Sequence, residues 1–172
     1  MRAVSNGEVD LLQLLLDMPA RCGAGYCVIG GLAVNAYAEP VVSLDLDLVV
    51  VSDGIDKVCR LAASKGLKIQ EFEHSTNLSM AGSDLRIQLR TDPRYQDFLP
   101  RAAKREVLGY AMMVASLQDV LRGKVWAYGD HRRRPSKRQK DLADIMRLVE
   151  THPQLAAELP RKSPRNSPVR SR

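Results

Sequence analysis

The sequence has few cysteines and no long apolar run. Its three cysteines, Cys22, Cys27 and Cys59, are an odd number without metal-ligand spacing. This excludes a disulfide framework and a zinc motif, and it favours reduced thiols in a cytoplasmic protein. No apolar run reaches the roughly 18 residues of a membrane span, and the opening MRAVSNGEVD lacks the apolar core of a signal peptide. We therefore expect a cytoplasmic protein that is not bound to a membrane.

The length and the apolar content are those of one domain. The chain has 172 residues, of which 45% are hydrophobic, so it can bury a core. We expect one domain over residues 1–159, with a core at 26–114 and a C-terminal helical part at 116–159. Residues 160–172, rich in Pro, Ser, Arg and Lys, are expected to be a disordered basic tail.

The charge is unevenly distributed along the chain. Residues 1–100 carry a formal net charge of −4, whereas residues 101–172 carry +10. A basic half beside an acidic half favours an anionic partner such as a nucleoside triphosphate, a nucleic acid or an acidic protein. A solvated surface with a basic tail explains the same asymmetry without any partner.

Two aspartates stand one residue apart in the apolar run from Leu44 to Val51. In a strand, side chains at i and i+2 lie on the same face, so Asp45 and Asp47 should point the same way. Two carboxylates held this close raise each other's proton affinity unless a cation lies between them. Magnesium, which takes one or two protein carboxylates and completes its shell with water and phosphate, suits this pair.

A glycine pair precedes the aspartates. Val28 and Ile29 lead into Gly30 and Gly31 and then into the helical pattern LAVNAYA. Glycine lets a phosphate approach the main chain, and free amides at a helix start favour an anion. Either signal alone fits an ordinary turn or a surface strand, but both in this order are specific.

This combination resembles the nucleotidyltransferase superfamily, which has the polymerase-beta-like fold. Its signature is a Gly-Gly or Gly-Ser turn followed by an Asp-x-Asp or Asp-x-Glu strand. The chain is most similar to small bacterial nucleotidyltransferase-like proteins related to abortive-infection and toxin–antitoxin nucleotidyltransferases. They share a Gly-Gly-Leu-Ala opening, here residues 30–33, and a Thr or Ser two residues before the first Asp, here Ser43. The resemblance covers roughly residues 9–150, including 116–124 and 140–144.

The resemblance implies an activity and a set of site residues. The activity is magnesium- or manganese-dependent transfer of a nucleotidyl group from a nucleoside triphosphate to a hydroxyl of RNA (tRNA included), a protein or a small molecule. A toxin-like role with an antitoxin-like partner, or a homo-oligomer, is also implied. The implied catalytic residues are Asp45, Asp47 and Lys124, with Lys124 facing the phosphates. The implied nucleotide-binding residues are Gly30, Gly31, Ser43, Lys140 and Asp144.

The third metal carboxylate of the superfamily departs from the pattern here. The third carboxylate should stand between two apolar residues of a neighbouring strand. In residues 83–89, the positions between apolar residues are occupied by Arg86 and Gln88 instead. Asp84 at the strand start is our candidate for the third metal ligand, and Asp92 after the strand is the other. Without a third carboxylate, Arg86 would neutralise the aspartates, and the protein would be a nucleotide binder, an antitoxin-like partner or a degenerate relative.

The basic C-terminal half offers a further reading. Lys140 and Asp144 lie i, i+4 on the polar side of the last helix, as do Lys137 and Asp141, so ordinary salt bridges explain them. A basic loop, Arg132 to Arg134, follows Trp126 and Tyr128, a mix that could stack and hold RNA. Packed core is the favoured reading for Trp126.

The periodicity predicts an α/β (α+β) fold: a small mixed β-sheet flanked by helices, nucleotidyltransferase-like, with C-terminal helices. Capping boxes are expected at residues 5–8, 116–119 and 136–139. Helices are expected at 9–18, 32–38, 55–65, 117–128 and after 136. Strands are expected at 26–30, 44–51, 67–72, 77–80 and 85–89, with one more strand region over 107–114.

Overall fold

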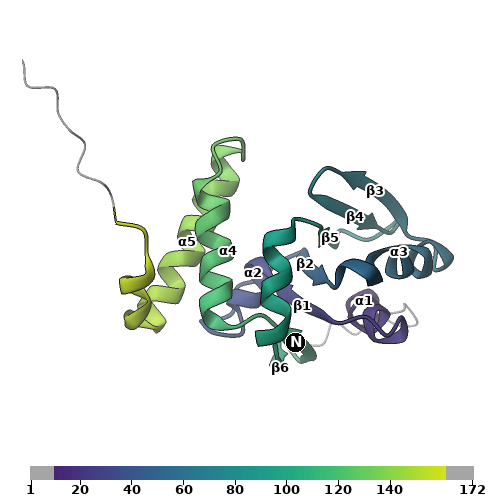
Figure 1. The fold of residues 1–172 in the computed structure, drawn as a ribbon, viewed down its shortest axis with the longest axis horizontal. Coiled ribbons are helices and arrows are strands. Elements are labelled where there is room, and N and C mark those ends of the chain that lie inside the picture. The colour runs from purple at the N-terminus through teal and green to yellow at the C-terminus, as the bar shows by residue number, and fades with distance from the viewer. Residues whose placement is uncertain (1–9, 162–172) are drawn as a thin grey trace, which may run out of the picture.

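The computed structural model describes residues 10–161. The capping box expected at residues 5–8 and the tail from residue 162 lie outside the described residues. The described chain is a mixed sheet with helices, which confirms the expected fold class (Figure 1). Within residues 10–161, no helix has the length and the apolar character needed to cross a membrane.

Most elements lie where the sequence periodicity predicts them, but the helix expected at 32–38 instead spans Gly30–Val34. The helices are α1 (Leu11–Arg21), α2 (Gly30–Val34), α3 (Ile55–Ser64), α4 (Leu117–Gly129) and α5 (Pro135–Thr151), with 3-10 segments η1 (Ser52–Gly54), η2 (Pro93–Arg101) and η3 (Pro153–Glu158). The strands are β1 (Tyr26–Ile29), β2 (Asp45–Val50), β3 (Lys68–Phe72), β4 (Ser75–Ser79), β5 (Arg86–Arg90), β6 (Ala103–Val107) and β7 (Tyr110–Val114).

The strands form one seven-stranded sheet in the order β3-β4-β5-β2-β1-β7-β6. β2 pairs in parallel with β5 and antiparallel with β1, so it lies in the middle of the sheet. Its apolar residues Leu46 and Leu48 are buried in the core. The strand that carries the two aspartates is therefore fixed by neighbours on both sides.

The helices lie in two groups around this sheet. α1 packs on α3, whereas α2 packs against β2, α4 and α5. In Figure 1 the α4–α5 pair lies on the left of β2, and β3, β4 and β5, which form one end of the sheet, lie on its right.

Three local predictions have clear outcomes. The Ser116 cap is confirmed, because its hydroxyl accepts a hydrogen bond from the Asp119 amide at 3.2 Å. The cap expected at Ser136 is wrong, since α5 begins one residue earlier at Pro135 and has no side-chain cap. The single strand region expected over 107–114 is a hairpin of two strands, β6 and β7, whose turn places Leu108 and Gly109 at positive φ.

Candidate active site

Strand β2 presents its two aspartates on one face. Asp45 and Asp47 are partly exposed, whereas the alternating Leu46 and Leu48 are buried. This is the pattern of a strand with one face on the core and one face open. Both aspartates line the same cleft.

Gly30 lies directly behind one of these carboxylates. Its φ is +72°, in the left-handed region that favours glycine, and a Cβ at this position would overlap the carboxylate of Asp47. Gly31 lies between two other predicted residues, because a Cβ there would be 3.7 Å from Ser43 Oγ and 3.8 Å from Asp144 Oδ2. The turn thus brings together Gly30, Gly31, Ser43, Asp47 and Asp144.

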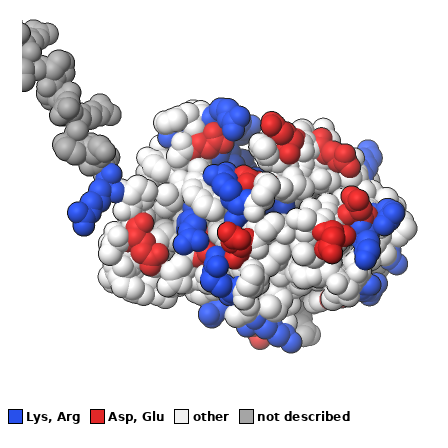
Figure 2. Space-filling view, in the orientation of Figure 1, with Lys and Arg blue, Asp and Glu red and all other residues white. Residues whose placement is uncertain are grey.

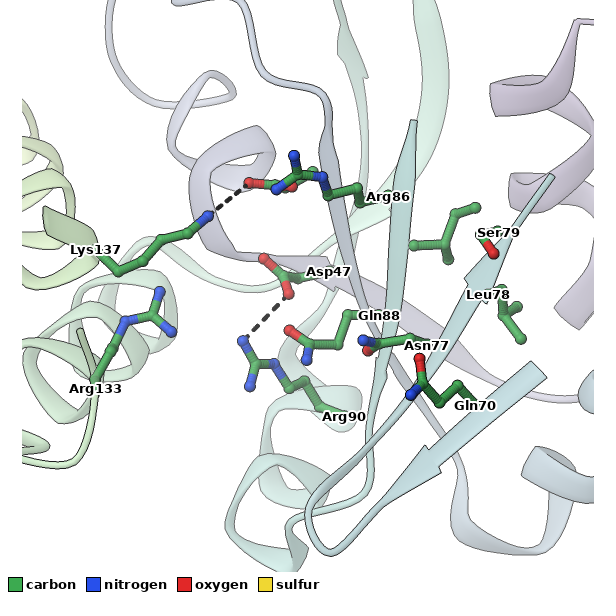
Figure 3. Close-up of a pocket in the computed structure, with 12 residues that line it drawn as sticks. Asp47, Gln70, Asn77, Leu78, Ser79, Arg86, Gln88, Arg90, Arg133 and Lys137 are labelled. Carbon is green, nitrogen blue, oxygen red and sulfur yellow. Dashed lines mark hydrogen bonds and ion pairs between the residues drawn. The ribbon is translucent and has the colours of Figure 1, made fainter. Parts of the chain in front are cut away.

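The aspartates open into a cleft of about 380 Å³ between the sheet and the C-terminal helices (Figure 3). One wall comes from β3, β4 and β5. Arg133, in the loop between α4 and α5, and Lys137, on α5, face this wall. Four cationic side chains therefore surround two carboxylates. The polar and charged lining residues are Asp45, Asp47, Gln70, Asn77, Ser79, Arg86, Gln88, Arg90, Arg133 and Lys137.

Basic side chains lie against both aspartates. Arg90 Nη2 is 3.3 Å from Asp47 Oδ1, and Lys137 Nζ is 3.5 Å from Asp45 Oδ2. Lys140 Nζ lies farther, at 3.9 Å from Asp45 Oδ2. All these groups are partly exposed, and pairs of this kind contribute about 1 kcal/mol or less. A ligand that enters the cleft can therefore replace these ion pairs at a small cost in free energy.

The strand next to the aspartates carries no carboxylate facing them. In the β2–β5 register, Asp45 is opposite Arg86 and Asp47 is opposite Gln88. Asp84 precedes β5, is exposed and does not line the cleft. Asp92 instead begins η2 and forms an ion pair with Arg94 at 2.8 Å, and the hydrogen bonds from Arg94 lower the pKa of the Asp92 carboxyl.

The donor set fits one divalent ion rather than two. Two carboxylates at i and i+2 on an open face match a magnesium or manganese ion that completes its shell with phosphate and water. In the described part of the chain, no group of three His, Cys, Asp or Glu residues is placed to hold a metal. The structure thus gives no support to Asp84 as a third ligand.

Lys124 lies behind the cleft, in a buried ion cluster between α4 and α5. Its Nζ is 3.0 Å from Asp141 Oδ1 and 2.7 Å from Asp144 Oδ2, and all three side chains are at most 8% exposed. Arg133 forms an ion pair with Asp141, and Arg147 forms one with Asp144. A lysine held in this way packs two helices together. Lys124 does not line the cleft of Asp45 and Asp47, but with Gly30 and Asp47 it lines a smaller hollow beside that cleft.

The ion pairs expected within α5 are wrong. Lys137 and Lys140 reach Asp45 on β2, whereas Asp141 and Asp144 turn inward to Lys124. The polar residues of this helix thus form two sets, one facing the cleft and one buried. The sequence did not show which member belonged to which set.

The aromatic residues before the basic loop are covered by arginines that lie outside it. Trp126 stacks on Phe98 at 5.7 Å between ring centroids, and the Arg94 guanidinium covers it at 4.7 Å. The guanidinium of Arg138 lies 5.3 Å from the Tyr128 ring. Trp126 is therefore part of the packing, the reading favoured from sequence. Figure 2 shows basic and acidic side chains interspersed over this face of the molecule.

Several residues of the cleft could not be identified from the sequence. Gln70, Asn77 and Arg90 lie on strands that are distant from β2 in sequence, and only the strand pairing brings them to the aspartates. Arg86, Gln88 and Arg90 alternate along β5, which does place them on one face. Nothing in the sequence states that this face is shared with Asp45 and Asp47.

Several solved structures share the fold of this chain. ANT(2")-Ia in complex with adenylyl-2"-tobramycin is 15% identical, with a TM-score of 0.61, over 86% of this chain and 89% of that one. The lincomycin-bound lincosamide antibiotic adenylyltransferase LnuA is 12% identical, with a TM-score of 0.57, over 83% of this chain and 99% of that one. The Megavirus polyadenylate synthase is 13% identical, with a TM-score of 0.54, over 87% of this chain and 33% of that one.

No protein-family model and no curated protein sequence matches the chain. The likeness at these identities is one of fold. The chain shares the fold of these structures, the fold that the glycine turn and the aspartate strand predicted.

Proposed function

We propose that this protein binds a nucleoside triphosphate in the cleft over β2 and transfers its nucleotidyl group to a hydroxyl acceptor. One observation carries the proposal: Asp45 and Asp47 share the open face of a buried central strand, directly beside the Gly30 turn, on a nucleotidyltransferase fold. In this proposal residues 26–114 form the core, and residues 116–159 close the cleft over it.

Asp45 and Asp47 would hold one magnesium or manganese ion, which, when bound, would neutralise phosphate charge and stabilise the leaving group. Arg86, Arg90 and Lys137 then contact the phosphates, since they line the same cleft. Gly30 keeps the main chain clear of the Asp47 carboxylate. These residues position the reactants, which is most of what nucleotidyl transfer asks of a protein.

The reaction itself is a substitution at phosphorus. The acceptor oxygen forms a bond to the α-phosphorus while the bond from that phosphorus to the bridging oxygen of the β-phosphate breaks. Pyrophosphate leaves with the electron pair, and the hydroxyl proton passes to solvent. The cations on β5 and α5 lie where they can stabilise charge that builds up on the departing phosphates.

The test is triphosphate binding by calorimetry with and without magnesium. The double substitution Asp45→Asn and Asp47→Asn should abolish the magnesium-dependent part of binding. The loss of triphosphate affinity should be on the order of 100-fold, because residues that bind the metal directly matter at least as much as the residues that hydrogen-bond to them. The free energy of unfolding should change by about 1 kcal/mol or less, because the ion pairs lost are partly exposed. Lys65→Ala, at the residue that directly follows α3, is the control. Unchanged magnesium-dependent binding in the double variant would count against the site.

A second candidate is nucleotide binding without transfer, in a degenerate or antitoxin-like protein. The observation that favours it is the face of β5, where Arg86 and Gln88 stand opposite the two aspartates. Incubation with each labelled triphosphate, magnesium and candidate acceptors separates the two functions. Binding without any labelled product identifies the non-catalytic protein.

A further inference from the structure

The polar face that holds the aspartates continues across three more strands. In register, Gln70 of β3 lies opposite Asn77 of β4, Asn77 opposite Gln88 of β5, and Gln88 opposite Asp47 of β2. Residues paired across strands share a face, and strands lie about 4.8 Å apart, so this row extends about 14 Å from the aspartate. Figure 3 shows these side chains on the sheet wall of the cleft.

The amides in this row have unused hydrogen-bonding capacity. Asn77 Oδ1 is buried and has no hydrogen-bond partner among the described residues. Gln88 Nε2 donates to Ser75 Oγ at 3.0 Å, and for Gln88 Oε1 no hydrogen bond within residues 10–161 is found. Buried polar atoms are nearly always satisfied in folded proteins. A ligand with its own donors and acceptors would satisfy this row.

An exposed aromatic side chain stands at the end of the same face. Phe72 is two residues from Gln70 in β3, so both side chains project from one face, and Phe72 is 51% exposed. His74 follows it in the hairpin turn and is also exposed. An open aromatic ring beside free amides is the arrangement on which a nucleobase stacks and is hydrogen-bonded.

Arginines close the other side of this space. Arg132 and Arg133 line a second hollow, of about 660 Å³, together with Phe72, Asn77 and Gln88. The carboxylates of Glu73 and Asp130 lie at the same hollow. Asn77, Gln88 and Arg133 also line the cleft of Asp45 and Asp47, so the two hollows adjoin. Arg132 Nε lies 3.6 Å from Asp130 Oδ1, and 83% of the Arg132 side chain is exposed, so this pair is open to solvent.

We propose that this surface, made by Phe72, Asn77, Gln88 and Arg132, binds a single-stranded polynucleotide. The bases of the polynucleotide contact the Phe72 ring and the amides of Asn77 and Gln88, and its phosphates contact Arg132. A duplex does not fit, because its bases are already stacked and paired. That the bound strand is the hydroxyl acceptor rests on the proposed function, whereas the binding itself does not.

The test is fluorescence anisotropy of the full chain with a labelled 12-nucleotide RNA, the DNA of the same sequence, and the duplex of each. RNA and DNA single strands both offer bases and phosphates to this surface. The one that binds more tightly is the nucleic acid that the surface prefers. We expect the single strands to bind more tightly than the duplexes. Phe72→Ala should weaken single-strand binding about tenfold, the effect of losing one stacked base. Met146→Ala, at a similarly exposed apolar residue of α5, should leave binding unchanged.

The salt dependence gives a second readout. Arg132→Gln should lower the slope of log affinity against log salt by about one, as expected for one lost phosphate contact. Arg60→Gln, at an exposed arginine on α3, is the control and should keep the slope.

Three outcomes would overturn the inference: no binding of single strands, equal binding of duplexes, or equal effects of Phe72→Ala and Met146→Ala. The proposed function fails separately. Strands that bind but are never extended with any triphosphate leave this surface standing without the transfer. Conversely, labelling of a small hydroxyl compound by a protein that binds no strand leaves the transfer standing without this surface.

Discussion

The cleft and the buried ion cluster are built from the same kinds of residue. In the cleft, Asp45 and Asp47 face Lys137 and Arg90, and every one of these groups reaches solvent. In the cluster, two aspartates of α5 hold Lys124 and are almost completely buried. The two sets lie close together, since Asp144 is beside Gly31 of the same turn that carries Gly30.

Burial gives these similar sets opposite roles. A charge removed from water must keep its partner, because an unpaired buried charge costs several kcal/mol. An exposed ion pair contributes little and can be replaced by water, a metal ion or a phosphate. The buried set therefore joins α4 to α5, and the exposed set is free to bind a ligand.

The largest effect that separates the two regions is expected from Lys124→Met. It removes the cation that Asp141 and Asp144 share and leaves each with one arginine, so the free energy of unfolding should fall by about 3 kcal/mol, the lower end for a broken buried pair. Urea denaturation followed by circular dichroism measures it. Lys137→Met, which removes a cation from the cleft, should lower the same quantity by about 1 kcal/mol or less. Equal losses in both variants would abolish the distinction between the two regions.

Gly30→Ala should have an intermediate effect, and it acts on the side of the cleft. The positive φ costs about 1–3 kcal/mol for a residue with a side chain, and the new methyl group must also displace the Asp47 carboxylate. Gly82→Ala is the matched control, because its φ of +79° is similar and no atom lies within 4 Å of the added Cβ. We expect both variants to lose stability in urea denaturation and only Gly30→Ala to lose magnesium-dependent triphosphate binding. Retained binding in Gly30→Ala would show that the close approach to Asp47 is dispensable.

The smallest effect is expected at an exposed ion pair outside both regions. Hydrogen bonds from Arg94 lower the pKa of Asp92 in the folded state. The pair therefore contributes stability above the ordinary pKa of an aspartate and loses it as the pH falls through the lowered pKa. Because Arg94 is largely exposed, Asp92→Asn should cost about 1 kcal/mol or less at pH 7.

Urea titrations of Asp92→Asn and of the unsubstituted protein at pH 7 and at pH 2.5 measure this difference, with Asp84→Asn as a control. The two proteins should converge at the lower pH. A difference that grows on acidification would contradict the assignment of the pair.

Much of the fold and part of the site could be read from the sequence. The alternation around Asp45 and Asp47 placed both on one face of β2, and the glycine pair placed a turn before them, because these are local properties of the backbone. The Ser116 cap is local in the same sense. The β6–β7 hairpin was missed because its turn, at Leu108 and Gly109, has no strong turn residues apart from one glycine.

The sequence by itself determined the chemistry available to this protein: two carboxylates on one strand face, a glycine turn beside them, and a basic C-terminal half. The tertiary structure decided which charges meet. Lys124 and Lys137 are both lysines in helical sequence patterns. Lys124 is nevertheless buried with two aspartates, whereas Lys137 faces Asp45. The row of Gln70, Asn77 and Gln88 exists only through strand register. The physical reason is that ion pairing and burial depend on distances between segments remote in sequence, which no local pattern contains.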